Sequence, residues 1–88
     1  DRKEDALDFA RQAIHMHPNK IEGWVLAGWS SYELEKYGEA DKYFESALGC
    51  DITSPDALHG KALVMKAMNK DFSYYNKALK SIDPDLVI

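Results

Sequence analysis

The sequence predicts an all-α fold of about five antiparallel helices. Apolar residues recur at intervals of three, four and seven along the 88-residue chain, which is the period of amphipathic helices. Signals for β-strands are weak, since the β-leaning runs are as short as Leu63-Val64-Met65 and no Asn-Gly or Asp-Gly hairpin turn occurs. The segments between the helical runs are short, so successive helices are expected to lie antiparallel beside each other.

The first two expected helices are separated by Pro18. The helix before this proline has one apolar face, formed by Leu7, Ala10 and Ile14. Because proline cannot continue a helix, this helix is expected to end near residues 15–17. The next helix is expected to begin at Asn19, whose side chain accepts hydrogen bonds from first-turn amides, and to run to about Lys36. Gly38 then marks a tight turn.

Three further helices are expected after this turn. The third covers about residues 39–48, and Gly49 is placed to end it with a left-handed cap. The fourth begins with Ser54 as its N-cap and Pro55 in its first turn, where proline is tolerated. The polar run 69–71 is expected to end the fourth helix, and a short fifth helix follows.

An internal repeat relates these helices. The spacing between Ala6 and Ala13 recurs between Ala40 and Ala47, one period further along the chain. Helix-turn-helix units with this period, about 34 residues, resemble the tetratricopeptide repeat. Counted from Ile21, small residues fall where two helices approach closely and large residues fall where space remains, as in that family. The matching residues are Trp24, Gly28, Ala40, Phe44 and Ala47.

The resemblance implies a single series of tetratricopeptide repeats over residues 1–88, stacked as a right-handed α-α superhelix. Residues 1–18 correspond to helix B of a preceding repeat, 21–54 to a complete repeat, and 55–84 to an irregular further repeat. The last helix is expected to be shortened, because Tyr74 falls where the repeat requires alanine. The absence of a first helix before residues 1–18 leaves an apolar face uncovered, so self-association is expected.

Charge and composition argue against several classes of function. The chain has 11 Lys and Arg residues, 15 Asp and Glu residues and a formal net charge of −4, and its basic residues are dispersed. Since nucleic-acid binding needs clustered basic residues, it is not expected. Membrane insertion is not expected either, because no apolar stretch approaches the roughly 20 residues that span a bilayer. Cys50 is the only cysteine, which excludes an internal disulfide and favours a reducing, cytoplasmic compartment.

No enzymatic activity, metal or cofactor is expected from the residue pattern. No nucleophile–base arrangement or glycine-rich phosphate loop occurs, and Cys50 has no assigned base. The run His15-Met16-His17 is the one metal-like spacing. Residues i and i+2 of a helix point about 200° apart, so these histidines are expected to be ordinary surface residues. The charged start of the chain and its lack of an initiator Met indicate a piece of a longer chain.

The resemblance implies a scaffold that binds protein or peptide along a concave face. The residues at the corresponding positions are Val25, Trp29, Tyr32, His59 and Leu63. Chaperone-binding members of the family clamp a C-terminal carboxylate with Lys and Asn at the positions held here by apolar residues and a histidine. A carboxylate clamp is therefore not expected. Packing of Trp29 and Tyr32 against a neighbouring repeat remains an alternative to a ligand site, and a structural spacer without a ligand remains an alternative function.

Two helical runs have a narrower resemblance. They are Glu22-Gly23-Trp24-Val25-Leu26-Ala27-Gly28-Trp29 and Asp56-Ala57-Leu58-His59-Gly60-Lys61-Ala62. Both are similar to segments of the long tetratricopeptide-repeat subunits of intraflagellar transport complex A, which moves cargo within cilia. This resemblance implies a scaffold subunit of a retrograde transport complex, located in the cytoplasm and the cilium and without catalytic activity.

Overall fold

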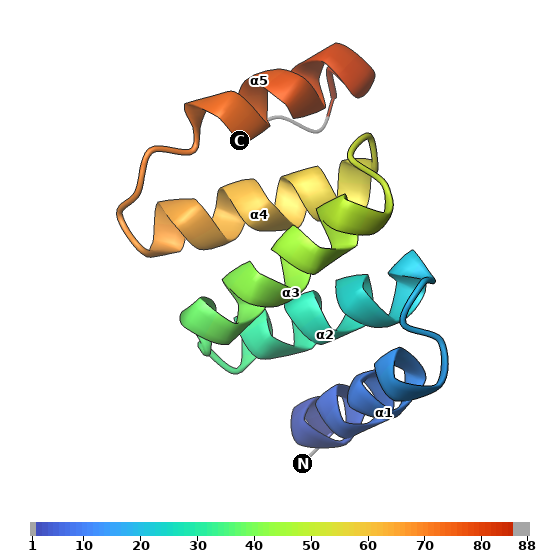
Figure 1. Cartoon of the computed structure of the whole chain (residues 1–88). Coiled ribbons are helices and arrows are strands. Elements are labelled where there is room, and N and C mark those ends of the chain that lie inside the picture. The colour runs from blue at the N-terminus through green and yellow to red at the C-terminus, as the bar shows by residue number, and fades with distance from the viewer. Residues whose placement is uncertain (1, 86–88) are drawn as a thin grey trace.

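The computed structural model describes residues 2–85, and within this range the fold is all-α, as predicted. Five helices and no strand are present, and Figure 1 shows them stacked in chain order, with α1 and α5 at opposite ends. The helices are α1 (Arg2–Met16), α2 (Ile21–Glu33), α3 (Tyr37–Cys50), α4 (Pro55–Ala67) and α5 (Ser73–Ile82). The last helix is short, as expected, with 10 residues against 14 in α3.

Each helix packs against the next one in the chain, and α2 also contacts α4 directly. α3 therefore packs against both of the helices that flank it in sequence. α2 and α4 each have 13 residues, and their first residues, Ile21 and Pro55, are separated by one period of the sequence repeat. The described part of the chain thus contains two helices of equal length, related by the same interval as the sequence repeat and lying side by side.

The turns that end α2 and α4 have the same backbone geometry. The residue after each C-cap has a left-handed backbone, with φ of 60° at Glu35 and 58° at Asn69. The next amide reaches back over the turn, from Lys36 to the Ser31 carbonyl and from Lys70 to the Met65 carbonyl, at 2.8 Å in both cases. These bonds satisfy carbonyls at the helix ends as a Schellman motif does.

Three of the expected helix boundaries are wrong. The N-cap of α2 is Lys20, which makes no side-chain capping bond, rather than Asn19. The turn after α2 comes earlier than expected because it is formed at Glu35, and Gly38 lies inside the first turn of α3. Gly49 also lies inside α3 and has no positive φ, so it forms no left-handed cap.

The start of α4 is as predicted. The Ser54 hydroxyl accepts a hydrogen bond from the Ala57 amide at 3.3 Å, and Pro55 occupies the first helical position. Upstream of α4, the Asp51 carboxylate accepts bonds from the Thr53 amide at 3.0 Å and the Thr53 hydroxyl at 2.7 Å. Such a bond from a side chain to the backbone two residues on stabilises the turn that leads into the helix.

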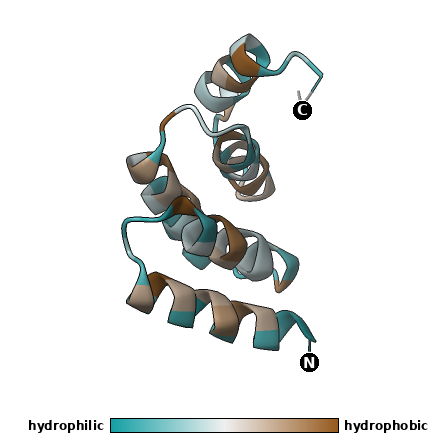
Figure 2. Ribbon diagram, turned by 90° about the vertical axis from the view of Figure 1, so that its right-hand side faces the viewer, coloured by the Kyte–Doolittle hydropathy of each residue, from teal (hydrophilic) through white to brown (hydrophobic). Residues whose placement is uncertain are grey.

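In the described part of the chain, two clusters of buried side chains connect α1, α2, α3 and α4. The first lies between α1 and α2 and is formed by Leu7, Ala10 and Ala27, with Ile14, Leu34 and Tyr43 packed against it. The second joins α3 to α4 and is formed by Ala40, Phe44 and Val64, with Trp29, Tyr32, Tyr37 and Met68 packed against it. Along α1, the helix next to the N label in Figure 2, hydrophilic and hydrophobic segments alternate, as expected for an amphipathic helix.

Phe44 occupies the space between three helices and is completely buried. A methyl group at Gly28 on α2 would lie 2.7 Å from its ring, and one at Gly60 on α4 would lie closer still. Real Cβ atoms essentially never approach other atoms that closely. The two glycines therefore allow one aromatic side chain of α3 to pack against the backbones of both neighbouring helices.

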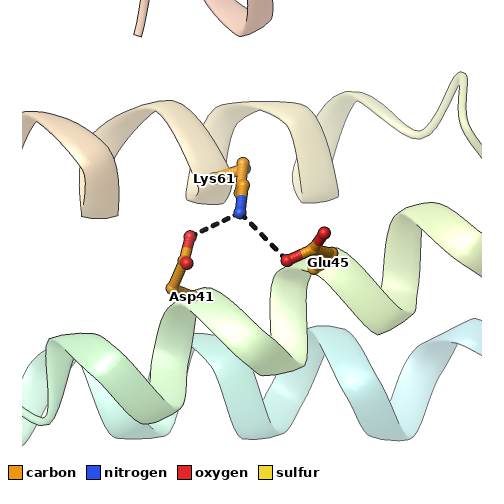
Figure 3. A network of polar contacts seen from close by, with 3 residues as sticks. All are labelled: Asp41, Glu45 and Lys61. Atoms are coloured by element: carbon orange, nitrogen blue, oxygen red, sulfur yellow. Dashed lines mark hydrogen bonds and ion pairs between the residues drawn. The ribbon is translucent and has the colours of Figure 1, made fainter. Parts of the chain in front are cut away.

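A buried cation makes a second connection between helices. Lys61 of α4 is only 5% exposed, and Figure 3 shows its ammonium directed toward α3, 2.6 Å from Asp41 and 3.5 Å from Glu45. The ammonium also lies 5.5 Å from the centre of the Tyr75 ring on α5. Burial opposes the charge, but the hydrogen bond to Asp41 and the nearby negative charges outweigh it and raise the pKa of Lys61 above its ordinary value.

We expect Gly60→Ala to destabilise the fold and Gly49→Ala to stabilise it. Overpacking a core costs about 1–3 kcal/mol, and here the added methyl meets the rigid, fully buried ring of Phe44. This cost exceeds the roughly 1 kcal/mol that alanine gains over glycine in a helix. At Gly49 a methyl would meet nothing within 4 Å, so only the helical gain applies. Urea denaturation followed by circular dichroism measures the free energy of unfolding of both variants. A Gly60→Ala protein as stable as the wild type would contradict the packing of Phe44 against Gly60.

We also expect acid to destabilise the fold through Asp51 and Asp71. Hydrogen bonds from Thr53 and Ser73 hold the pKa of these carboxyls below the ordinary value of 3.8. Their contribution to stability is therefore present above pH 3.8 and is lost as the pH falls through the lower, folded-state pKa.

The double variant Asp51→Asn/Asp71→Asn is the test of this acid dependence. Asparagine retains a side-chain oxygen that accepts the same bonds but does not titrate. The free energy of unfolding should fall less steeply between about pH 4 and pH 2 in this variant than in the wild type. If urea denaturation gives the same pH dependence of the free energy of unfolding for both proteins, these two turns do not contribute to the acid sensitivity of the fold.

Candidate functional site

The five residues expected on the binding face fall into a group of three and two outlying positions. Trp29, Tyr32 and His59 are half-buried, and the Trp29 ring contacts the rings of the other two. Val25 lies one turn before Trp29 on α2 and lines a pocket together with it. Leu63 is half-buried on α4, one turn beyond His59, and is not among the residues that line this pocket.

Trp29 is at the centre of an aromatic cluster that connects α2, α3 and α4. Its ring meets Phe44 edge-on with centroids 5.1 Å apart, and it meets His59 and Tyr32 in similar geometry at 5.8 and 6.0 Å. Tyr32 in turn lies 5.6 Å from Tyr37 at the start of α3. Edge-to-face contacts of this kind stabilise aromatic packing. One face of Trp29 therefore belongs to the core, and the residue also contributes to the surface.

An open pocket lies beside Trp29, where the starts of α2 and α4 come together. Its volume is about 300 Å³. The lining residues are Ile21, Glu22, Val25, Leu26 and Trp29 from α2, with Ser54 and Asp56 from the beginning of α4. Most of the lining is apolar, and Leu26 is 37% exposed in it.

The two carboxylates at the pocket are both exposed. Glu22 and Asp56 lie in the first turns of α2 and α4, where a negative charge is favoured by the helix dipole. Within the described part of the chain, no ion pair is formed by either carboxylate. The arrangement is an apolar surface with negative charge beside it, which can bind an apolar group next to a cation.

Of the residues that line this pocket, only Val25 and Trp29 belong to the binding face expected from the sequence. In the sequence, Ile21 stands out as the start of a repeat and Ser54 as an N-cap, and Leu26 belongs to the run 22–29 with the narrower resemblance. The acidic pair could have been found from the repeat, since Glu22 and Asp56 are separated by one repeat period. The interval places them at equivalent points of α2 and α4, and these two helices are in contact.

The other residues considered for chemistry do not assemble into a centre. His15 is exposed in the last turn of α1, and His17 is exposed just beyond it. Within residues 2–85, no group of three or more His, Cys, Asp or Glu side chains is arranged to hold a metal ion. Cys50 is exposed at the end of α3. Trp24 is half-buried and donates a hydrogen bond from its indole nitrogen to the Pro18 carbonyl at 2.9 Å, which braces the turn between α1 and α2.

Within residues 2–85, a single buried side-chain polar atom lacks a hydrogen-bond partner. The hydroxyl of Ser31 is fully buried on α2 and makes no hydrogen bond within the described residues. Ser31 stands where the resemblance would place a tyrosine, and Tyr32 follows it. An unpaired buried hydroxyl destabilises a fold. It lies in the packed interior and is not among the residues that line the pocket.

Comparison with protein-family models and with curated proteins finds no match to this chain. Among the helices of residues 2–85, none is long and apolar enough to cross a membrane. The functional conclusion therefore depends on the residues and geometry described above.

Proposed function

We propose that this chain is a protein-binding scaffold built of tetratricopeptide repeats, without catalytic activity of its own. The observation on which this depends is the half-buried aromatic cluster around Trp29, which lies beside an open apolar pocket between two equivalent helices. A pocket of about 300 Å³ is at the small end of the range for ligand sites. It suits one or two side chains of a partner segment.

The repeat assignment is supported by the geometry of α2 and α4. They have the same length, begin one repeat period apart, and end in turns with the same hydrogen bonds. Small residues lie fully buried at the expected positions Ala40 and Ala47, and Phe44 is buried between α2 and α4. These features are those of stacked helical hairpins, and such arrays generally present extended binding surfaces.

We further propose that the scaffold is a subunit of a ciliary intraflagellar transport complex. The basis is the resemblance of the runs 22–29 and 56–62 to segments of the long subunits of intraflagellar transport complex A. These two runs contain most of the residues of α2 and α4 that face the pocket or the core. A cytoplasmic and ciliary location follows from the same proposal. The alternative is a structural spacer, in which the pocket is covered by other parts of the same protein.

Exposed apolar side chains at the two ends of the stack support self-association as a further property. Phe9 and Met16 on α1 are 65% and 70% exposed, and Tyr74 on α5 is 67% exposed. Surfaces of this kind favour contact with another protein surface. In a longer chain, neighbouring helices of the same protein would cover them.

The test is crosslinking mass spectrometry on the tagged protein from ciliated cells, with a variant at the pocket. Val25→Asp places a charge in the apolar lining and leaves the aromatic cluster intact. It is more informative than truncating Trp29, whose ring also packs on Phe44. Ser46→Asp is the control, because it places the same charge at an exposed position of α3 that does not line the pocket.

We expect crosslinks from α2 and α4 to intraflagellar transport subunits, which Val25→Asp reduces and Ser46→Asp leaves unchanged. Crosslinks confined to segments of the same chain would favour the spacer. Crosslinks to unrelated proteins that are sensitive to Val25→Asp would support binding at the pocket and contradict the ciliary assignment. Circular dichroism of each variant establishes that helix content is retained.

A further inference from the structure

We propose that the pocket between α2 and α4 binds a partner segment in which a large apolar side chain stands next to lysine or arginine. The inference rests on the proposed function and specifies the chemistry of the partner at the same site. It is derived from the composition of the pocket and from the charges beside it.

The apolar part of the partner is expected to contact the surface of α2. Ile21, Val25 and Leu26 provide aliphatic area, and Trp29 contributes an aromatic surface at the end of the row. These side chains remain partly exposed in the described structure, so a side chain inserted among them would remove apolar area from water on both partners. The pocket is open to solvent, which allows a segment of chain to lie across it.

The basic part of the partner is expected to lie at the acidic edge. Glu22 and Asp56 approach the pocket from two different helices, and neither is engaged in an ion pair within residues 2–85. The starts of α2 and α4 each contribute a partial positive charge of about half a unit, which is less than the full charge of each carboxylate. The edge is therefore negative, and it complements a lysine or arginine.

The same features disfavour an acidic partner. A C-terminal carboxylate would meet two like charges at the edge and would find Val25 and Trp29 where a cationic clamp needs polar residues. The net charge of −4 on the whole chain also slows the approach of an acidic partner and favours the approach of a basic one. The predicted preference is thus opposite in sign to that of a carboxylate clamp.

The experiment is an NMR titration of the 88-residue chain with three synthetic peptides. Each peptide has a central leucine between two identical residues, in the frame Gly-Ser-X-Leu-X-Ser-Gly, where X is lysine, glutamine or glutamate. The indole N–H signal of Trp29 reports occupancy of the pocket, and that of Trp24, which is absent from the pocket lining, is the internal control. A fourth peptide with lysine at X and alanine in place of leucine tests the apolar anchor.

We expect the lysine peptide to bind about fivefold more tightly than the glutamine peptide, and the glutamate peptide to bind most weakly. A fivefold ratio is equivalent to about 1 kcal/mol in total, which two weak, exposed ion pairs can supply together. Added salt should reduce the preference. Glu22→Gln/Asp56→Asn should abolish it, whereas Glu4→Gln/Asp5→Asn should preserve it, because that control removes the same two charges from the first turn of α1.

The remaining outcomes distinguish this inference from the proposed function. Equal binding of all three peptides, or tighter binding of the glutamate peptide, would overturn the basic partner and leave the pocket as a docking site. If no peptide shifts the Trp29 signal while crosslinks sensitive to Val25→Asp persist, the inference fails and the proposed function stands. If no peptide shifts the Trp29 signal and no crosslink is sensitive to Val25→Asp, both the inference and the proposed function are overturned.

Discussion

The packing of Phe44 between Gly28 and Gly60 is the constraint on which the rest of this structure depends. The ring is fully buried, and neither glycine leaves space for a methyl group beside it. Because the ring comes from α3 and the glycines from α2 and α4, this contact fixes how closely three helices approach. Shape complementarity of this kind acts at short range, so a change of one methyl group affects all three helices.

The candidate site is a consequence of the same contact. Trp29 packs edge-on against Phe44, and its remaining surface lines the pocket. The close approach of α2 and α4 also brings Glu22 and Asp56 to one opening, although a full repeat period separates them in the chain. The ion pair of Lys61 with Asp41 adds a second connection between α3 and α4.

Most of the helices and the main buried residues could be predicted from the sequence, because both depend on local periodicity. The capping role of Ser54 and the burial of Phe44 follow from residue type and spacing. The turn at Glu35 could not be predicted, because glutamate rarely adopts a left-handed backbone. Backbone hydrogen bonds to the carbonyls of the preceding helical turn hold it in that conformation. The role of Gly60 depends on contacts between helices, which no local pattern reveals. The acidic edge of the pocket follows from the repeat interval between Glu22 and Asp56 only once α2 and α4 are known to be in contact.

A double-mutant cycle between Phe44 and Gly60 tests the central claim most directly. The free energies of unfolding of the wild type, Phe44→Leu, Gly60→Ala and the double variant are compared in urea denaturation. If the Phe44 ring and a methyl group at position 60 compete for the same space, the smaller leucine relieves the clash. Gly60→Ala then lowers the free energy of unfolding clearly less in the Phe44→Leu protein than in the wild type. Strictly additive losses would contradict the packing of Phe44 against α4.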